Sequence, residues 1–203
     1  EITDLLELKN NVILEGVPGV GKTWIMDKLK QKLGIENSSA RFRSITFSPS
    51  SGPEEFIGGL FPTASSAPPI FKFNEGVLLK IAIAAAKDQS KRPYLLFIDE
   101  INRGNIAKIM GQIMTVIESK KRFEPNGSRQ VLVDVPDDVP YRATLFTNGK
   151  QSQRLGLPSN LYIVGAMNTS DRSVVQIDGA LRRRFAFVRL PTLLTRPNIP
   201  PLL

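Results

Sequence analysis

Five short segments of the chain have the residue pattern of β-strands, and stretches with helical spacing of apolar residues separate them. Four of these segments are nearly continuous apolar runs, and one alternates between apolar and polar residues. They lie at 11–15, 43–48, 94–98, 161–166 and 185–190. Apolar residues three or four positions apart predict helices over 22–33, 75–87, 105–118 and 174–183. Strands that alternate with helices predict an α/β fold, in which a parallel five-stranded sheet lies between layers of helices.

Two segments interrupt this alternation. Residues 48–70 contain five prolines among serines and glycines, which predicts a loop with room for one helical turn at 54–57. Residues 121–160 are polar and rich in turn residues. The segments 131–135 and 142–146 within them are typical of an inserted β-hairpin region.

The length of 203 residues suits one domain that carries an insertion. The predicted organisation is a single core at 1–190 with the hairpin insertion at 121–160. A tail at 191–203 follows, and its four prolines leave it little capacity to fold alone.

Cysteine and histidine are both absent from the sequence. Their absence excludes disulfide bonds, thiolate catalysis, zinc sites built on these residues and Ser-His-Asp chemistry. The 27 Lys and Arg residues exceed the 19 Asp and Glu residues by 8, which favours an anionic partner such as nucleotide phosphates, nucleic acid or an acidic protein surface. No apolar run approaches the roughly 20 residues of a membrane span, and no signal-peptide pattern is visible. We therefore expect a cytoplasmic protein without a membrane segment.

The segment between the first predicted strand and the first predicted helix matches the phosphate-loop pattern G-x-x-x-x-G-K-[ST]. Glycines let the backbone curl so that successive N–H groups point at phosphate oxygens, and the following helix presents its positive N-terminus to the same anion. Lys22 is expected to reach the β- and γ-phosphates, and the hydroxyl of Thr23 is expected to bind Mg²⁺. The predicted nucleotide-binding residues are Gly16, Val17, Pro18, Gly19, Val20, Gly21, Lys22, Thr23 and Trp24.

Asp99 and Glu100 follow the apolar segment 94–98 and form the second part of the predicted site. In a parallel sheet, the carboxyl ends of the strands and the phosphate loop share one crevice. Asp99 is expected to hold Mg²⁺, because hard cations prefer oxygen ligands. Glu100 is expected to orient and polarise the attacking water. Acidic residues also end many ordinary strands, so this signal depends on the presence of the loop.

These features and three further segments resemble the McrB-like AAA+ GTPases, the nucleotide-driven subunits of modification-dependent restriction systems. The segments are Ile101-Asn102-Arg103-Gly104-Asn105-Ile106, Gly165-Ala166-Met167-Asn168-Thr169-Ser170-Asp171-Arg172-Ser173 and Ala180-Leu181-Arg182-Arg183-Arg184-Phe185. The resemblance covers residues 8–190. It implies a P-loop AAA+ core that hydrolyses GTP with Mg²⁺ and assembles as a homo-oligomeric ring, expected to be a hexamer. It further implies that the ring drives DNA translocation or cleavage together with a McrC-like nuclease subunit.

The resemblance also assigns roles to single residues. Asn168 corresponds to the sensor whose amide contacts the γ-phosphate and the attacking water, and Asp171 corresponds to a second water-positioning group. Arg183 corresponds to the arginine that acts on the nucleotide of a neighbouring subunit, with Arg184 assisting. Other interpretations stay open, because Asn168 and Asp171 are also typical of a helix cap and adjacent arginines of a solvated turn at a helix end.

Several questions stay open at the level of sequence. No residue visibly encodes recognition of guanine, so GTP rests on the resemblance and ATP is the alternative. An ATP-dependent MoxR-like protein-remodelling factor and a non-catalytic nucleotide-binding scaffold are the competing functions. The helical lid that usually follows an AAA+ core is expected to be absent or truncated. Few aromatic residues accompany the basic residues of the insertion, so solvated charge is preferred to contact with DNA. These basic residues are Lys120, Lys121, Arg122, Arg129, Arg142, Lys150 and Arg154.

Overall fold

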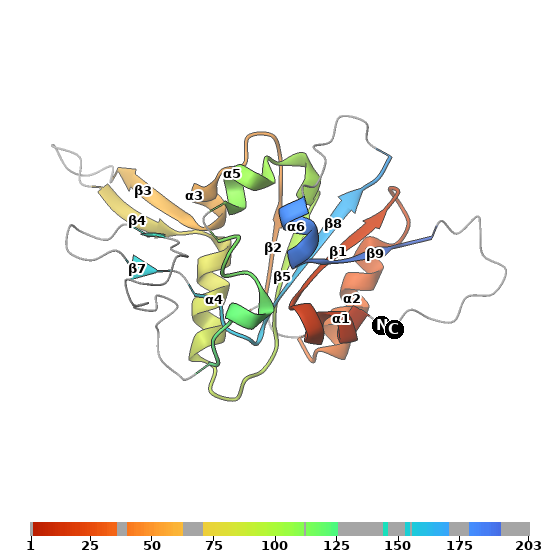
Figure 1. Ribbon diagram of the computed structural model, residues 1–203, viewed down its shortest axis with the longest axis horizontal. Coiled ribbons are helices and arrows are strands. Elements are labelled where there is room, and N and C mark those ends of the chain that lie inside the picture. The colour runs from red at the N-terminus through yellow and green to blue at the C-terminus, as the bar shows by residue number, and fades with distance from the viewer. Residues whose placement is uncertain are drawn as a thin grey trace.

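A parallel sheet of five strands forms the centre of the protein, in the order β2-β5-β8-β1-β9 (Figure 1). The strands are β1 (Asn11–Gly16), β2 (Phe42–Thr46), β5 (Tyr94–Asp99), β8 (Leu161–Asn168) and β9 (Ala186–Arg189). This computed structural model describes residues 2–35, 40–62, 71–111, 113–125, 144–145, 153–154, 156–170 and 179–191. Every neighbouring pair of strands is parallel, so the predicted five-stranded α/β fold is confirmed.

Alternate residues of the central strands face two separate hydrophobic cores. In β1, Val12 and Leu14 belong to one core and Ile13 belongs to the other. The helices on the first core are α1 (Ile2–Lys9) and α2 (Lys22–Lys32), and those on the second are α4 (Val77–Lys87), α5 (Ile106–Met110) and α6 (Gly179–Arg184). Because both faces of these strands are buried, their sequences are apolar runs without alternation.

Two helices differ from the prediction. α1 packs Ile2 and Leu6 into the first core, although the sequence pattern predicts no element before β1. The helix predicted over 105–118 is regular only as far as Met110, and residues 113–117 form turns that lead to the short 3₁₀ helix η2 (Ser119–Lys121). Ile113 and Ile117 in these turns are still buried. The helical spacing in this part of the chain therefore indicates which residues are buried, although the helix itself does not continue.

An antiparallel hairpin of β3 (Gly58–Pro62) and β4 (Phe71–Glu75) lies outside the main sheet (Figure 1). The sequence pattern predicts a loop over 48–70, and this prediction is wrong for the residues of β3. The helix predicted over 75–87 is confirmed as α4. Glycine and proline occupy three of the five positions of β3, and Leu60 and Phe61 are exposed. No alternation with a buried face therefore marks the strand, and α4 begins only at Val77.

Gly76 joins this hairpin to α4 where the main chain of α3 (Pro53–Phe56) passes close by. A Cβ atom at position 76 would lie 2.5 Å from the carbonyl carbon of Phe56, which is closer than side chains approach a backbone. The N–H of Gly76 donates to the carbonyl of Ile57 at 2.8 Å. Glycine therefore lets the hairpin and α4 pack against α3, which corresponds to the helical turn predicted at 54–57.

The chain leaves the core for the insertion and returns to it at one place, here called the neck, where Phe123 contacts Leu157 and Ser159. The N–H of Phe123 donates to the carbonyl of Leu157 at 3.1 Å, and the N–H of Ser159 donates to the carbonyl of Phe123 at 2.8 Å. Phe123 and Pro158 form an isolated β-bridge at the same place. The two ends of the insertion are therefore held together by main-chain hydrogen bonds.

Within the insertion, β6 (Thr144–Leu145) pairs antiparallel with β7 (Gln153–Arg154). β6 falls inside the strand predicted at 142–146, but its partner is β7, and the strand predicted at 131–135 lies outside the described residues. The tail beyond 191 also lies outside them. No helix within the described part of the chain is long and apolar enough to cross a membrane.

Arg122 ties the neck to the beginnings of two strands. Its Nη1 donates to the carbonyls of Leu161 at 2.8 Å and Pro158 at 3.3 Å. Its Nε donates to the carbonyl of Ile117 at 3.1 Å, and its Nη2 donates to Oδ1 of Asn11 at 2.7 Å. Burial lowers the pKa of Arg122 to about 9, so the guanidinium stays protonated at neutral pH. The prediction of solvated charge is wrong for this residue, because protein oxygens take the place of water around it.

We expect the substitution Arg122→Met to lower the free energy of unfolding by about 2–4 kcal/mol, because it leaves buried carbonyl oxygens without donors. Urea unfolding followed by circular dichroism measures this loss. The control Glu124→Gln weakens the surface ion pair of Glu124 with Lys91 at 2.8 Å and its hydrogen bond with Ser159, and it should cost less than about 1 kcal/mol, because these contacts are exposed. Similar losses in the two variants would contradict the structural importance of Arg122.

Candidate nucleotide-binding site

The phosphate loop joins the end of β1 to the beginning of α2. Gly19 and Gly21 within it have φ angles of +76° and +94°, and residues with a Cβ atom rarely adopt this left-handed conformation. Gly21 is also the N-cap of α2. The two glycines therefore let the chain reverse within a few residues and place the N-terminus of α2 at the carboxyl edge of the sheet, where it favours an anion.

The ammonium group of Lys22 lies over the loop itself. Its Nζ donates to the carbonyl of Gly16 at 2.8 Å and to the carbonyl of Val17 at 3.1 Å. Burial lowers the pKa of Lys22, and the carboxylates of Glu100 and Asp99 oppose this effect. The structure therefore brings the loop lysine and both acidic residues of the predicted site into one electrostatic environment.

Glu100 has a strained backbone directly after β5. Its φ of 49° and ψ of 41° are left-handed, which is uncommon for a residue other than glycine. Its N–H donates to Oδ1 of Asp99 at 3.0 Å. Its buried Oε2 has no hydrogen-bond partner, although it lies 3.3 Å from Nε of Arg103 in an ion pair. Strained residues of this kind cluster at functional sites.

Asn168 ends β8 and lies beside the phosphate loop. The register of β1 with β8 places Gly16 opposite Asn168, and the N–H of Thr169 donates to the carbonyl of Gly16 at 3.3 Å. Oδ1 of Asn168 accepts from the N–H of Ser170 at 3.3 Å and from its hydroxyl at 3.0 Å. The amide oxygen of Asn168 therefore closes a local turn at the end of β8, beside the phosphate loop.

Asn102 connects the ends of β5 and β8, and sequence analysis did not assign it a role. It lies in the 3₁₀ turn η1 (Ile101–Arg103), is 1% exposed, and donates from Nδ2 to the carbonyl of Asn168 at 3.1 Å. In the sequence, the feature that could point to Asn102 is its position as an uncharged polar residue shortly after the buried strand and the acidic pair. That feature does not reveal the partner, because β8 lies far away in the sequence.

The residues near the loop fit a magnesium ion that is shared with a nucleotide. Thr23 supplies a hydroxyl and Asp99 a carboxylate, and Mg²⁺ usually keeps its waters and phosphate ligands beside one or two such protein groups. No group of three or more acidic side chains that could hold a metal alone occurs among the described residues. The donor set is therefore suited to a metal that arrives with its phosphates.

Trp24, directly after Thr23, is 58% exposed, and Nζ of Lys28 lies 5.9 Å from the centre of its ring. Asp171 lies outside the described residues. The structure thus groups the loop with Asp99, Glu100 and Asn168 at one edge of the sheet.

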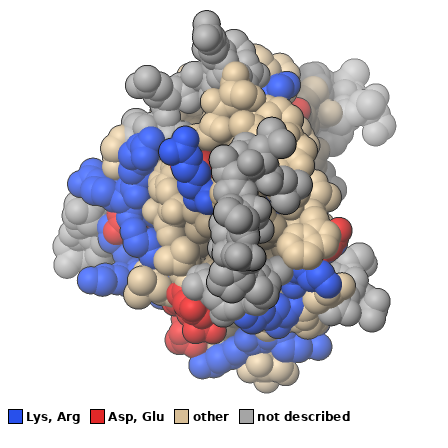
Figure 2. Space-filling model, turned by 90° about the vertical axis from the view of Figure 1, so that its right-hand side faces the viewer, with Lys and Arg blue, Asp and Glu red and all other residues tan. Residues whose placement is uncertain are grey.

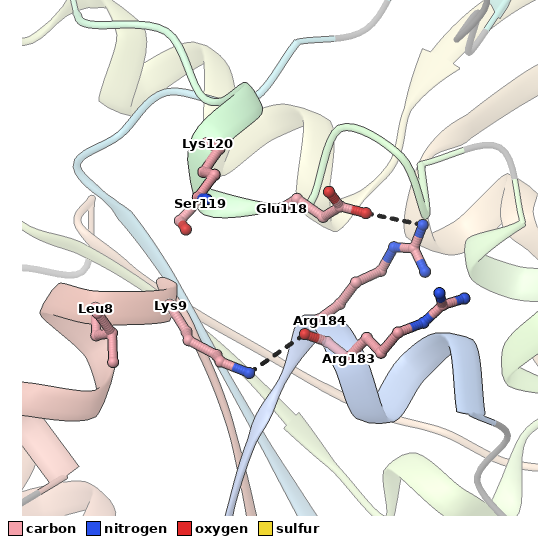
Figure 3. A pocket seen from close by; sticks show the side chains of 7 residues that line it. All are labelled: Leu8, Lys9, Glu118, Ser119, Lys120, Arg183 and Arg184. Carbon is pink, nitrogen blue, oxygen red and sulfur yellow. Dashed lines mark hydrogen bonds and ion pairs between the residues drawn. The ribbon is translucent and has the colours of Figure 1, made fainter.

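The predicted arginines lie at the other edge of the sheet, where β1 and β9 begin. They line a pocket of about 530 Å³ between the end of α1, the turn η2 and the end of α6 (Figure 3). Arg183 is exposed. Arg184 is 15% exposed, and its Nη2 lies 2.9 Å from Oε1 of Glu118. The two arginines therefore differ in their surroundings, and neither is close to the phosphate loop of its own chain.

The positive charge of the protein is dispersed over the face that Figure 2 shows. The described Lys and Arg side chains fall into separate groups there, and acidic side chains lie beside some of them. The net charge of +8 therefore does not form one continuous basic patch on this view of the described residues.

A phosphate loop after β1, with an acidic pair at the end of β5 and a polar residue at the end of the intervening β8, defines a P-loop nucleoside-triphosphate-binding fold of the AAA+ type. The chain belongs to the AAA domain family (dynein-related subfamily), which matches residues 11–185.

Two curated relatives are components of restriction systems. The chain is 35% identical over 183 residues to the type IV methyl-directed restriction enzyme EcoKMcrB subunit of Escherichia coli, with 90% of this chain and 36% of that protein covered. It is 29% identical over 205 residues to the type II restriction enzyme BsuMI component YdiS of Bacillus subtilis, with 90% and 57% covered. The resemblance to McrB is confirmed, and the chain spans less than two thirds of the length of either relative.

A solved structure, a putative ATPase from Cytophaga hutchinsonii, covers 91% of this chain and 43% of its own length. Its TM-score is 0.47 and its sequence identity to this chain is 16%.

We expect Lys22→Ala to weaken nucleotide binding by about ten- to a hundredfold, because a hydrogen bond to a charged group contributes about 1.5–3 kcal/mol and 1.4 kcal/mol is tenfold in affinity. Trp24 is the only tryptophan of the chain, so its fluorescence can follow a nucleotide titration. The control Lys30→Ala removes a lysine of the same helix that pairs with Asp27 at 2.6 Å, and it should leave the affinity unchanged. Equal affinities for Lys22→Ala and the wild type would contradict the assignment of the loop.

Proposed function

We propose that this chain is the motor core of a McrB-type restriction complex and acts as a Mg²⁺-dependent nucleoside triphosphatase that prefers GTP. The observation that supports this most directly is the arrangement of the loop after Gly16, Asp99 and Asn168 at one edge of three adjacent strands. The similarity to the EcoKMcrB subunit and to the BsuMI component supports the assignment to restriction. The preference for GTP rests on the McrB resemblance.

In this proposal the loop residues bind and orient the triphosphate. Lys22 exchanges its hydrogen bonds with the carbonyls of Gly16 and Val17 for bonds to the β- and γ-phosphates. Thr23 and Asp99 hold Mg²⁺, which when bound neutralises charge on the phosphate oxygens. The N-terminus of α2 supplies N–H donors to the same anion.

The water that attacks the γ-phosphate is positioned by residues at the ends of β5 and β8. Glu100 accepts a hydrogen bond from the water and polarises it. Asn168 orients the water and a γ-phosphate oxygen, and Asp171 is the second positioning group. An in-line approach of the water to the γ-phosphate then depends on geometry and charge more than on covalent chemistry by the protein.

Arg183 completes the site of a neighbouring subunit. A guanidinium in this role stabilises charge that develops on the phosphate oxygens, and such an arginine contributes a factor of about 10³–10⁵ in related phosphoryl-transfer enzymes. Arg183 is exposed and lies far from its own loop, which is the arrangement that action on a neighbour requires. We therefore propose a homo-oligomeric ring, with a hexamer as the expected form, that works in the cytoplasm with a McrC-like nuclease on DNA.

We expect Glu100→Gln to lower turnover by about 10²–10⁴-fold, because the amide keeps the shape of the side chain but cannot act as a base. Phosphate release measures turnover, and titration of Trp24 fluorescence should show nearly unchanged nucleotide affinity. The control Glu55→Gln changes an exposed carboxylate of α3 and should have no effect on either quantity. Wild-type turnover in the Glu100→Gln variant would exclude this mechanism.

Mg²⁺ with GTP should raise the melting temperature of the protein more than Mg²⁺ with ATP at the same concentration. A ligand at 100 times its dissociation constant adds about 2.7 kcal/mol, which corresponds to a shift of about 5–10 °C for a protein of this size. Differential scanning fluorimetry measures this shift. Selective stabilisation by ATP would instead favour a MoxR-like, ATP-dependent remodelling factor with the same fold.

A further inference from the structure

The pocket at the amino edge of the sheet is built from three parts of the chain that are distant in sequence. α1 contributes Leu8 and Lys9, the turn η2 and its N-cap just before the insertion contribute Glu118 to Lys120, and the end of α6 contributes Arg183 and Arg184 (Figure 3). This is the place where the insertion meets the helix that carries the arginines. The contacts across it determine how these arginines are presented.

The side chain of Arg184 is engaged within its own subunit. Its Nη2 pairs with Oε1 of Glu118 at 2.9 Å, its Nη1 donates to the carbonyl of Ala180 at 2.8 Å, and its Nε donates to the carbonyl of Met114. The exposed fractions are 15% for the side chain of Arg184 and 35% for that of Glu118. A pair shielded to this degree is screened less by water and salt than a fully exposed pair.

The main-chain carbonyls of Arg183 and Arg184 also accept hydrogen bonds, from the side chains of Lys9 and Asn11. Nζ of Lys9 donates to the carbonyl of Arg183 at 3.3 Å. Nδ2 of Asn11 donates to the carbonyl of Arg184 at 3.1 Å and to the carbonyl of Ile117 at 2.8 Å. Asn11 in turn accepts from Arg122, so the base of the insertion is bonded to the end of α6 through this network as well.

Arg183 is the exception in this segment. Its guanidinium makes no hydrogen bond or ion pair with the residues that the structure describes, and it is exposed. No dashed line joins its side chain to the other residues in Figure 3. Successive residues of a helix point about 100° apart, so the contact that fixes Arg184 also fixes the direction in which Arg183 leaves the helix.

We propose that Glu118 is a positioning residue: by holding Arg184 inside its own subunit, it directs Arg183 alone toward a neighbour. This inference rests on the proposed function, in which Arg183 acts on the nucleotide of the next subunit. It assigns Arg184 an anchoring role in place of the assisting role that the sequence predicts. It also makes the base of the insertion part of the machinery that acts on the neighbouring site.

The test compares Glu118→Ala and Glu118→Gln with Arg183→Ala and with the control Glu124→Gln in the assembled protein. We expect Glu118→Ala to lower kcat by about 10–100-fold with an unchanged KM, because a misplacement of about 1 Å costs about that much. Arg183→Ala should lower kcat by about 10³-fold or more. Glu118→Gln preserves the shape of the side chain and should show a smaller loss in the same direction, while Glu124→Gln should match the wild type.

Mixed assemblies separate positioning from a general loss of structure. Subunits with Glu118→Ala keep an intact nucleotide site, and subunits with Glu100→Gln keep an intact arginine segment. A mixture of the two should therefore hydrolyse nucleotide faster than either variant alone. Wild-type kcat in both Glu118 variants, or no gain on mixing, would overturn the proposed role of Glu118. Wild-type kcat in Arg183→Ala would instead overturn the proposed function on which it rests.

Discussion

Because β1, β5 and β8 bury both of their faces, a shift of one residue in any of them would exchange the side chains of the two hydrophobic cores. Val12 and Leu14 would then replace Ile13, and the helices on both sides would lose their packing partners. This double burial fixes the register of the strands. It also fixes the level at which each strand ends, so that Gly16 lies opposite Asn168. The geometry of the site at the carboxyl edge is therefore set by apolar packing below it.

The polar groups of the site already have partners from their own chain. Lys22 donates to carbonyls of the phosphate loop, Glu100 is paired with Arg103, and Asn168 closes a turn with Ser170. Partly buried polar groups need such contacts, because leaving them unpaired costs free energy. A bound nucleotide has to exchange these bonds for its own. The affinity for nucleotide is therefore a difference between two sets of polar contacts.

The parts of the fold and site that follow from local pattern could be predicted from the sequence. The three central strands are buried apolar runs, the phosphate loop is contiguous, and the acidic pair directly follows the apolar run 94–98. The parts that depend on distant contacts could not. Arg122 resembles any surface arginine until the carbonyls around it are placed, and the β3–β4 hairpin has exposed side chains and a glycine-rich strand. The adjacent arginines Arg183 and Arg184 are alike in local sequence, and they are distinguished by the contacts of Arg184 with Glu118 and with the carbonyls of Ala180 and Met114.

The neck at Phe123 has a consequence for the history of this chain. Main-chain hydrogen bonds of Phe123 with Leu157 and Ser159 join the two ends of the insertion. The insertion is therefore attached to the core as a closed loop. The entropy of closing a loop grows only slowly with its length, by about 0.6 kcal/mol for each doubling. Residues between the two ends can therefore be added, removed or exchanged at little cost to the sheet. The insertion is a module in which new surfaces for partners can evolve while the core keeps its sequence.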